Sequence, residues 1–288
     1  MLRLLLISIS CCCLQPVHAQ LFTDSLSIEG KTRTFRYYRP EKAKKPLRII
    51  FLLHGSGGNG EGMRRTAASL EAVAEAENLL LVYPDGYKRY WNECRKMAAS
   101  EANKEDINEE AFFTEMLYYL RKRYPLREAV HAIGFSGGGH MAYKLALTLP
   151  QQFTSVTAIV ANLPDSANLD CTASGTPVSV LIVNGTADEV NPYNGGPMMV
   201  NGASFGGVRS SQESLRYWAE LAGYRGAPVE AALPDAVADD QTIVRHTFQA
   251  AGKPEITLLE VRGAGHEAPT DIDVFREALL FFKRNSRP

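Results

Sequence analysis

The sequence lacks the charge imbalance that marks proteins bound to nucleic acid or to membrane surfaces. Its 31 Lys and Arg residues almost balance its 32 Asp and Glu residues, which leaves a net charge of −1. Such a balance gives no basic footprint for nucleic acid and no polybasic segment for a membrane. The charged residues are therefore interpreted as a mixed, solvated surface.

Metal-ligand spacing is lacking as well. The chain has five Cys and six His residues, and they form no cluster with the spacing of a zinc site. Nothing in the composition points to a bound cofactor. The sequence predicts neither a metal nor a cofactor.

The N-terminal apolar run, residues 4–14, is too short to span a bilayer. It follows the positively charged start Met1-Leu2-Arg3 and precedes Val17-His18-Ala19, which resembles a small-residue cleavage site. This pattern predicts a secretory signal peptide over residues 1–19, cleaved near Ala19, and a secreted or periplasmic protein. The alternative is a lipoprotein signal that ends at one of three cysteines, but the leucine expected three positions upstream is absent before Cys11, Cys12 and Cys13.

Few cysteines remain after such a cleavage, namely Cys94 and Cys171. In an oxidising compartment these two residues form one disulfide or stay as two buried thiols. The sequence does not choose between the two states, because separation along the chain says nothing of the Cα distance.

Apolar strands alternate with helical patterns from residue 20 to the C-terminus. The 288 residues, 45% of them hydrophobic, suit one large domain with a sizeable core, so residues 20–288 are predicted to be one domain. The expected fold is α/β, a mostly parallel doubly wound sheet with an N-terminal antiparallel hairpin. Strands are expected at 21–28, 33–38, 47–53, 79–83, 130–135, 156–160, 177–183, 243–248 and 256–261, and helices at 61–77, 106–123, 138–149, 208–222 and 271–284.

A G-x-S-x-G motif, Gly134-Phe135-Ser136-Gly137-Gly138, joins one of these strands to the helix that follows it. Strand, sharp turn and helix in direct succession are typical of the nucleophile of an α/β-hydrolase. The turn would lift the Ser136 hydroxyl clear of the sheet and aim it at a helix N-terminus, where backbone N–H groups favour negative charge. Ser136 is the candidate nucleophile.

Two more polar residues follow predicted strands, Asp188 and His266. The chain order Ser, Asp, His is that of the α/β-hydrolase fold. Imidazole titrates in the right range to take and return the serine proton, and a carboxylate fixes its tautomer. The competing carboxylates have weaker positions in the chain, namely Glu189, Asp239, Asp240 and Asp271. The other histidines are interpreted as structural, namely His131, His140 and His246.

A glycine-rich loop, His54-Gly55-Ser56-Gly57-Gly58-Asn59-Gly60, follows the strand at 47–53. No Gly-Lys-Ser/Thr follows it, which argues against a phosphate cradle. With few bulky side chains, its backbone N–H groups can approach a substrate carbonyl and form an oxyanion hole. The predicted donors are the N–H of Gly137 and one from Ser56 or its neighbours, and His54 is expected to shape the loop rather than act as a base.

With these motifs the chain resembles the secreted esterases grouped as polyhydroxybutyrate depolymerase-like and feruloyl or acetylxylan esterase-like, the family-one carbohydrate esterases. The resemblance implies a serine esterase whose triad is Ser136, Asp188 and His266, with Trp91 and the Tyr193 loop beside the substrate. For Trp91, the residues alone leave open a loop anchored by its own aromatics. The matching pieces are 54–59, 83–86, 91–92, 134–138, 162–164, 185–188, 192–196 and 265–266.

The expected substrates are feruloyl or acetyl esters of plant polysaccharide. The alternative is a polyester or oligomer of hydroxybutyrate, although Glu267-Ala268-Pro269 replaces the Trp-Pro pair that such relatives often place after the histidine. A non-catalytic binding protein on a hydrolase scaffold is a remote alternative, since such a scaffold has no reason to keep the triad. A peptidase is possible on this fold, but the extra domain that usually gates such enzymes is not expected in this sequence. The sequence does not predict the oligomeric state.

Overall fold

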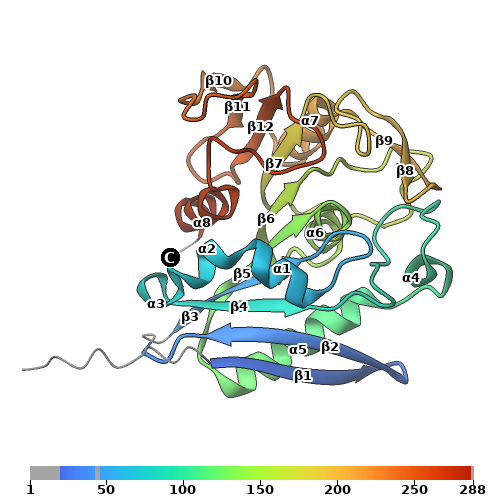
Figure 1. Cartoon of the computed structure of the whole chain (residues 1–288), viewed down its shortest axis with the longest axis vertical. Coiled ribbons are helices and arrows are strands. Elements are labelled where there is room, and N and C mark those ends of the chain that lie inside the picture. Colours follow the sequence, from blue (N-terminus) through green and yellow to red (C-terminus); the bar gives the residue numbers. More distant parts are fainter. Residues whose placement is uncertain (1–19, 43–45, 287–288) are drawn as a thin grey trace, which may run out of the picture.

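The computed structural model describes residues 20–42 and 46–286. The predicted signal peptide lies outside the described residues. This part of the chain forms twelve strands and eight helices, whose arrangement is drawn in Figure 1. The strands are β1 Gln20–Ile28, β2 Lys31–Arg39, β3 Leu47–Leu53, β4 Leu79–Pro84, β5 Leu126–Phe135, β6 Phe153–Ile159, β7 Ser179–Gly185, β8 Gly196–Val200, β9 Ala203–Val208, β10 Val229–Ala232, β11 Thr242–Phe248 and β12 Ile256–Arg262.

Ten of these strands form one sheet in the order β1-β2-β4-β3-β5-β6-β7-β12-β11-β10. The six central strands, from β4 to β12, pair in parallel. Antiparallel pairs close both edges, β1 and β2 on one side and β11 and β10 on the other. The predicted fold class is confirmed, including the N-terminal hairpin.

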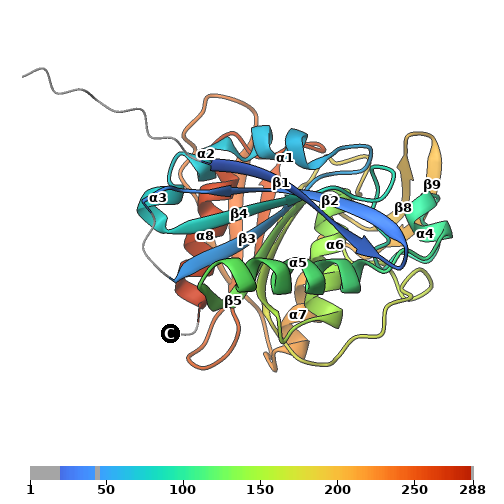
Figure 2. The ribbon, with the colours of Figure 1, turned by 90° about the horizontal axis from the view of Figure 1, so that it is seen from below.

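Helices cover both faces of the sheet (Figure 2). Helices α5, α6 and α7 contribute to one apolar core, and α1, α2 and α8 to the other. The central strands β3, β4 and β7 are buried along their whole length, which is why they are nearly continuous apolar runs in the sequence. The helices are α1 Gly60–Thr66, α2 Ala68–Glu71, α3 Ala74–Glu77, α4 Glu101–Lys104, α5 Glu109–Arg123, α6 Gly137–Thr148, α7 Ser211–Leu221 and α8 Val274–Asn285.

The single helix predicted at 61–77 is wrong, because the segment is broken into α1, α2 and α3. Its buried residues Met63, Leu70 and Ala74 keep spacings that suit a helix facing the sheet. That spacing reports which side chains face the core. It does not require every turn to keep α-helical geometry, and the chain leaves this geometry at Ala67.

The small sheet of β8 and β9 lies where the sequence shows no strand pattern. The helix predicted from residue 208 begins at Ser211 instead, because β9 extends to Val208. Ser210 caps this helix: its hydroxyl accepts from Glu213 N, and the Glu213 carboxylate accepts from Ser210 N. This capping box fixes the helix start.

Candidate active site

Ser136 stands in the sharp turn between β5 and α6. Its backbone has φ 53° and ψ −117°, a conformation that L-residues rarely adopt. Two glycines make the turn possible: a Cβ on Gly134 would lie 1.9 Å from the Gly138 carbonyl oxygen, and one on Gly138 would lie 2.1 Å from the Leu53 carbonyl oxygen. The strained turn leaves the Ser136 side chain half-buried at the end of the sheet.

His266 connects the serine to a buried carboxylate. Its Nε2 lies 2.9 Å from Ser136 Oγ, and its Nδ1 lies 2.7 Å from Asp188 Oδ2. Since a carboxylate can only accept, Nδ1 carries the proton and Nε2 is free to accept the one on Ser136. This arrangement is able to remove a proton from the serine hydroxyl.

Asp188 is held from its other side by the backbone. Its side chain is fully buried, and its Oδ1 accepts hydrogen bonds from Val190 N and Asn191 N, both at 2.8 Å. Each carboxylate oxygen therefore has a defined partner. These contacts fix the rotation of the carboxylate and thereby the imidazole that it orients.

The loop of residues 54–59, named the His54 loop below, packs against the same turn. A Cβ on Gly55 would lie 3.4 Å from Ser136 Cβ. One on Gly137 would lie 2.6 Å from Ser56 Oγ and 3.0 Å from Ser56 N. The predicted oxyanion donors, Ser56 and Gly137, thus lie side by side next to Ser136. Gly137 is the first residue of α6, so its N–H has no acceptor within the helix.

These contacts bring together segments that are far apart in the chain, because β3, β5, β7 and β12 are parallel and end at one edge of the sheet. A family model agrees with the arrangement: the Esterase model, described as "Putative esterase", matches residues 25–189, more than half of the chain. This chain belongs to the esterase family. The matched range includes Ser136 and Asp188 and ends before His266.

Two relatives and one solved structure that carry the name esterase also match this chain. The esterase chain is 30% identical over 174 residues to "Putative esterase NocK" of Nocardia uniformis subsp. tsuyamanensis, covering 58% of this chain and 48% of that protein. It is 29% identical over 164 residues to feruloyl esterase C of Emericella nidulans, covering 54% of each. It therefore spans about half the length of these two relatives.

The acetyl xylan esterase from Aspergillus awamori shares the fold of this esterase. The TM-score is 0.61 at 15% identity, and the match covers 90% of this chain and 99% of that one. At this identity the likeness concerns the fold alone. Together with the family model, it confirms the esterase resemblance predicted from the sequence.

His54 directly follows β3, and both of its ring nitrogens are hydrogen-bonded to the backbone. Nδ1 donates to Gly55 O across 2.8 Å, and Nε2 accepts from Gly86 N across 2.9 Å. Burial lowers the pKa of the imidazole, which keeps it neutral in this role. The contacts agree with the prediction that His54 shapes the loop.

Trp91 does not line an open cleft. It is 2% exposed, and its ring packs near the His54 imidazole and the Phe113 ring, with centroids 4.8 and 6.0 Å away. Trp91 is therefore packed against the His54 loop in this structure. This burial favours a loop anchored by its own aromatics, and the substrate contact expected for Trp91 stays a prediction.

Tyr193 is half-buried, and its hydroxyl is engaged by other side chains. It donates to Glu260 Oε2 at 2.8 Å and accepts from Gln212 Nε2 at 3.1 Å. These bonds tie the Tyr193 loop to β12 and α7. A direct contact between this hydroxyl and a substrate would have to break them, so its predicted place beside the substrate stays a prediction.

No pattern in the sequence predicts that β8 and β9 lie near the site. The Asn201 amide between these strands donates to the Tyr90 hydroxyl across 3.3 Å. A Cβ on Gly57 would lie 3.9 Å from the same hydroxyl. The Tyr90 ring also stacks on Phe205 of β9, with centroids 6.4 Å apart. The β8–β9 hairpin is therefore a neighbour of the His54 loop, a contact that only the folded chain reveals.

Cys94 and Cys171 form a disulfide, with Cα atoms 5.0 Å apart. Within residues 20–42 and 46–286, no group of three or more His, Cys, Asp or Glu side chains is placed to hold a metal ion. No helix in the same residues has the length and apolar character needed to cross a membrane.

Proposed function

We propose that this chain is a serine carboxylic-ester hydrolase in which Ser136 is the nucleophile, His266 the general base and acid, and Asp188 the orienting carboxylate. The observation that supports this most is the hydrogen-bonded line from Asp188 through His266 to Ser136, which stands in a strained turn. Membership of the esterase family supports the same chemistry. A non-catalytic binding protein would have no need for this chain of hydrogen bonds.

In the first half-reaction, Ser136 Oγ would bond to the ester carbonyl carbon as His266 Nε2 takes the hydroxyl proton. The carbonyl oxygen becomes an oxyanion, which the N–H groups of Ser56 and Gly137 would bind, and the closeness of these two residues supports this. When the tetrahedral adduct collapses, the bond to the alcohol oxygen breaks. His266 returns the proton to that oxygen, so the alcohol leaves neutral and an acyl-enzyme remains.

In the second half-reaction, a water molecule would take the place of the serine hydroxyl. His266 accepts its proton as the oxygen bonds to the acyl carbon, and the same two N–H groups bind the second oxyanion. Collapse breaks the bond to Ser136 Oγ, to which His266 delivers the proton. The products are a carboxylic acid and the original enzyme, which balances the hydrolysis of one ester by one water.

The proposed substrates are feruloyl or acetyl esters of plant polysaccharide. The support is that the chain is 29% identical to feruloyl esterase C of Emericella nidulans over 54% of its length. Hydroxybutyrate esters are the alternative that the substrate test must include.

We also propose that the protein is exported. The Cys94–Cys171 disulfide supports this, since such bonds persist in oxidising compartments. The intact mass of protein recovered from the periplasm or the medium should correspond to a chain that starts at Gln20. A lipid-modified N-terminal cysteine would instead establish the anchored alternative.

The decisive variant is Ser136→Ala, matched by Ser166→Ala at an exposed serine elsewhere. Hydrolysis of p-nitrophenyl acetate should be nearly abolished in the first variant and unchanged in the second, with the same circular dichroism in both. Full turnover by Ser136→Ala would overturn the nucleophile assignment. A panel of methyl ferulate, acetylated xylan and hydroxybutyrate oligomers then ranks the substrates by kcat/KM, and preference for the oligomers would overturn the polysaccharide-ester proposal.

A further inference from the structure

The indole of Trp91 contacts the His54 loop in two ways. Its Nε1–H donates to the backbone oxygen of His54 across 2.9 Å, and its ring packs on the His54 imidazole with centroids 4.8 Å apart. The same carbonyl oxygen lies close to the turn at Ser136, since a Cβ on Gly138 would be 2.8 Å from it. One buried side chain thus holds both the carbonyl and the ring of His54.

The His54 ring in turn holds the next peptide group. Its Nδ1–H donates to Gly55 O at 2.8 Å, and Gly58 N donates to the same oxygen at 2.9 Å. The other ring nitrogen accepts from Gly86 N at 2.9 Å. Because both nitrogens are bonded and one ring face packs on Trp91, the imidazole has no freedom to rotate without losing a contact.

Peptide planarity carries this orientation to Ser56. The carbonyl of Gly55 and the N–H of Ser56 belong to one planar trans peptide, so they point in opposite directions. The carbonyl is directed at His54 Nδ1 and Gly58 N, and therefore the Ser56 N–H is directed away from them. Ser56 N lies 3.0 Å from the position of a Cβ on Gly137, next to the other proposed oxyanion donor.

We propose that Trp91 is a positioning residue that aims the Ser56 N–H at the oxyanion, acting through the carbonyl and the ring of His54. It does so without touching the substrate, since it is 2% exposed. The proposal rests on the proposed function, because an aimed N–H matters only if an oxyanion forms beside Ser136.

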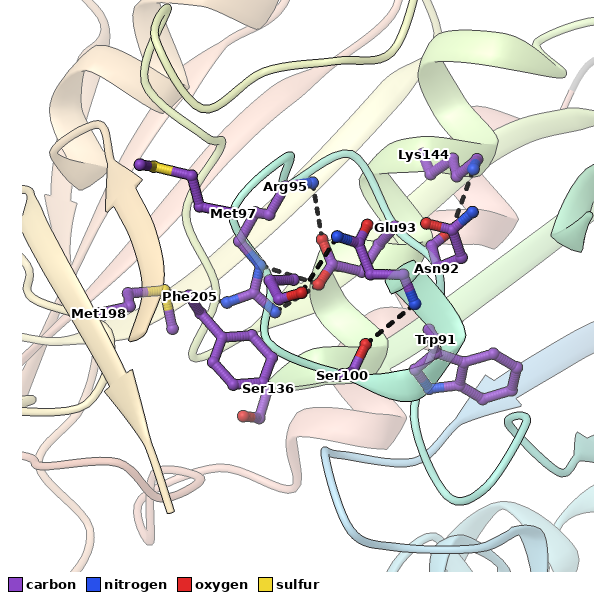
Figure 3. A network of polar contacts seen from close by, with 12 residues as sticks. Trp91, Asn92, Glu93, Arg95, Met97, Ser100, Ser136, Lys144, Met198 and Phe205 are labelled. Atoms are coloured by element: carbon purple, nitrogen blue, oxygen red, sulfur yellow. Dashed lines mark hydrogen bonds and ion pairs between the residues drawn. The ribbon is translucent and has the colours of Figure 1, made fainter. Parts of the chain in front are cut away.

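The chain directly after Trp91 is hydrogen-bonded to other segments, and its contact with Lys144 is drawn in Figure 3. Asn92 donates through Nδ2 to Ile107 O at 3.0 Å, and its backbone carbonyl accepts from Lys144 Nζ of α6 at 2.9 Å. Two residues later, the disulfide joins Cys94 to Cys171. The Lys144 bond ties the segment to α6, the helix that begins directly after Ser136. The position of Trp91 is therefore coupled to that of the proposed nucleophile.

The test compares the two tryptophans of the chain. Trp91→Phe keeps an aromatic ring beside His54 and removes the N–H donor. Trp218→Phe is the matched control, because Trp218 is fully buried and its Nε1 has no hydrogen-bond partner among the described residues. Loss of one oxyanion donor typically costs about 10²–10³ in kcat, so a misdirected donor in Trp91→Phe should lower kcat at least roughly tenfold. KM should change by less than about threefold, and Trp218→Phe should match the wild type.

The pH dependence of kcat/KM adds a second readout. Its apparent pKa should be unchanged in Trp91→Phe, because Asp188 and His266 keep their contacts. A kcat within twofold of wild type would overturn the proposal, as would an equal loss in Trp218→Phe. A loss confined to KM would mean that Trp91 contacts the substrate and would overturn it as well.

If Trp91→Phe does not fold, His54→Gln tests the same peptide group. The Gln amide reaches the Nε2 position but leaves Gly55 O without its side-chain donor, so kcat should again fall while KM is retained. Unchanged kcat in His54→Gln would refute the proposal. Ester hydrolysis by the wild type, abolished in Ser136→Ala, separates these outcomes from failure of the proposed function itself.

Discussion

Replacement of Asp188 by Asn should abolish most of the activity through a change of tautomer in His266. Oδ1 of Asp188 accepts two backbone N–H groups, from Val190 and Asn191. An amide nitrogen cannot accept these bonds, so the Asn oxygen must occupy that position. Its NH2 group then faces Nδ1 of His266, which in the wild type lies 2.7 Å from Oδ2.

A donor at that position requires Nδ1 of His266 to accept, and the ring proton moves to Nε2. Nε2 faces Ser136 Oγ at 2.9 Å and can no longer take its proton. The same substitution in the triad of a serine protease lowers kcat about 10⁴-fold, which corresponds to roughly 5.5 kcal/mol of transition-state stabilisation. We expect a loss of this order here, because the two backbone bonds leave the Asn amide no alternative orientation.

The matched control is Glu189→Gln, which removes the same charge from the neighbouring, exposed residue. Steady-state hydrolysis of p-nitrophenyl acetate should show the large loss in Asp188→Asn and a kcat within about twofold of wild type in Glu189→Gln. Thermal unfolding should be similar in both variants, since the amide keeps the two backbone bonds. A kcat for Asp188→Asn within tenfold of wild type would refute the tautomer argument, and so would equal losses in the two variants.

Two further predictions concern stability. Burial, and to a lesser degree the Arg48 charge, lowers the pKa of His131 from 6.5 to about 3. Below pH 6.5 the unfolded state therefore binds a proton that the folded state does not, and the free energy of unfolding falls by about 2 kcal/mol between pH 7 and pH 5. In His131→Gln, urea unfolding should lack this part of the pH dependence. The disulfide closes a loop with a sequence separation of 77, so replacing Cys94 and Cys171 by Ser should lower the free energy of unfolding by about 2–4 kcal/mol, and an unchanged urea midpoint would contradict this.

Much of the sheet was predictable because burial on both faces leaves a simple record in the sequence. Strands β3, β4 and β7 are buried throughout, and each appears as a nearly continuous apolar run. Polar residues directly after such runs collect at one edge of a parallel sheet, which is how Ser136, Asp188 and His266 could be chosen before their distances were known. The disulfide could not be chosen, since Cys94 and Cys171 are 77 residues apart in sequence and only the fold brings them together.

The remaining parts depend on contacts that have no local pattern. Strands β8 and β9 pair mainly with each other, and their apolar residues Met198 and Phe205 pack in a small separate cluster. Neither the length nor the alternation of these segments marks them as strands. The position of Trp91 was equally hidden, because an aromatic in a loop near the sheet edge can face either the solvent or the loop behind it.

The presence of a histidine at the end of a strand does not show whether it is a catalytic base or a structural residue. His54 and His266 both follow strands that end at the candidate active site. The two nitrogens of His54 are bonded to backbone groups of Gly55 and Gly86, so neither is available to take a proton from a hydroxyl. His266 instead has a carboxylate on one nitrogen and a serine hydroxyl on the other. Only the second set of partners allows a proton to be accepted and returned, which is the physical reason for assigning catalysis to His266 and loop geometry to His54.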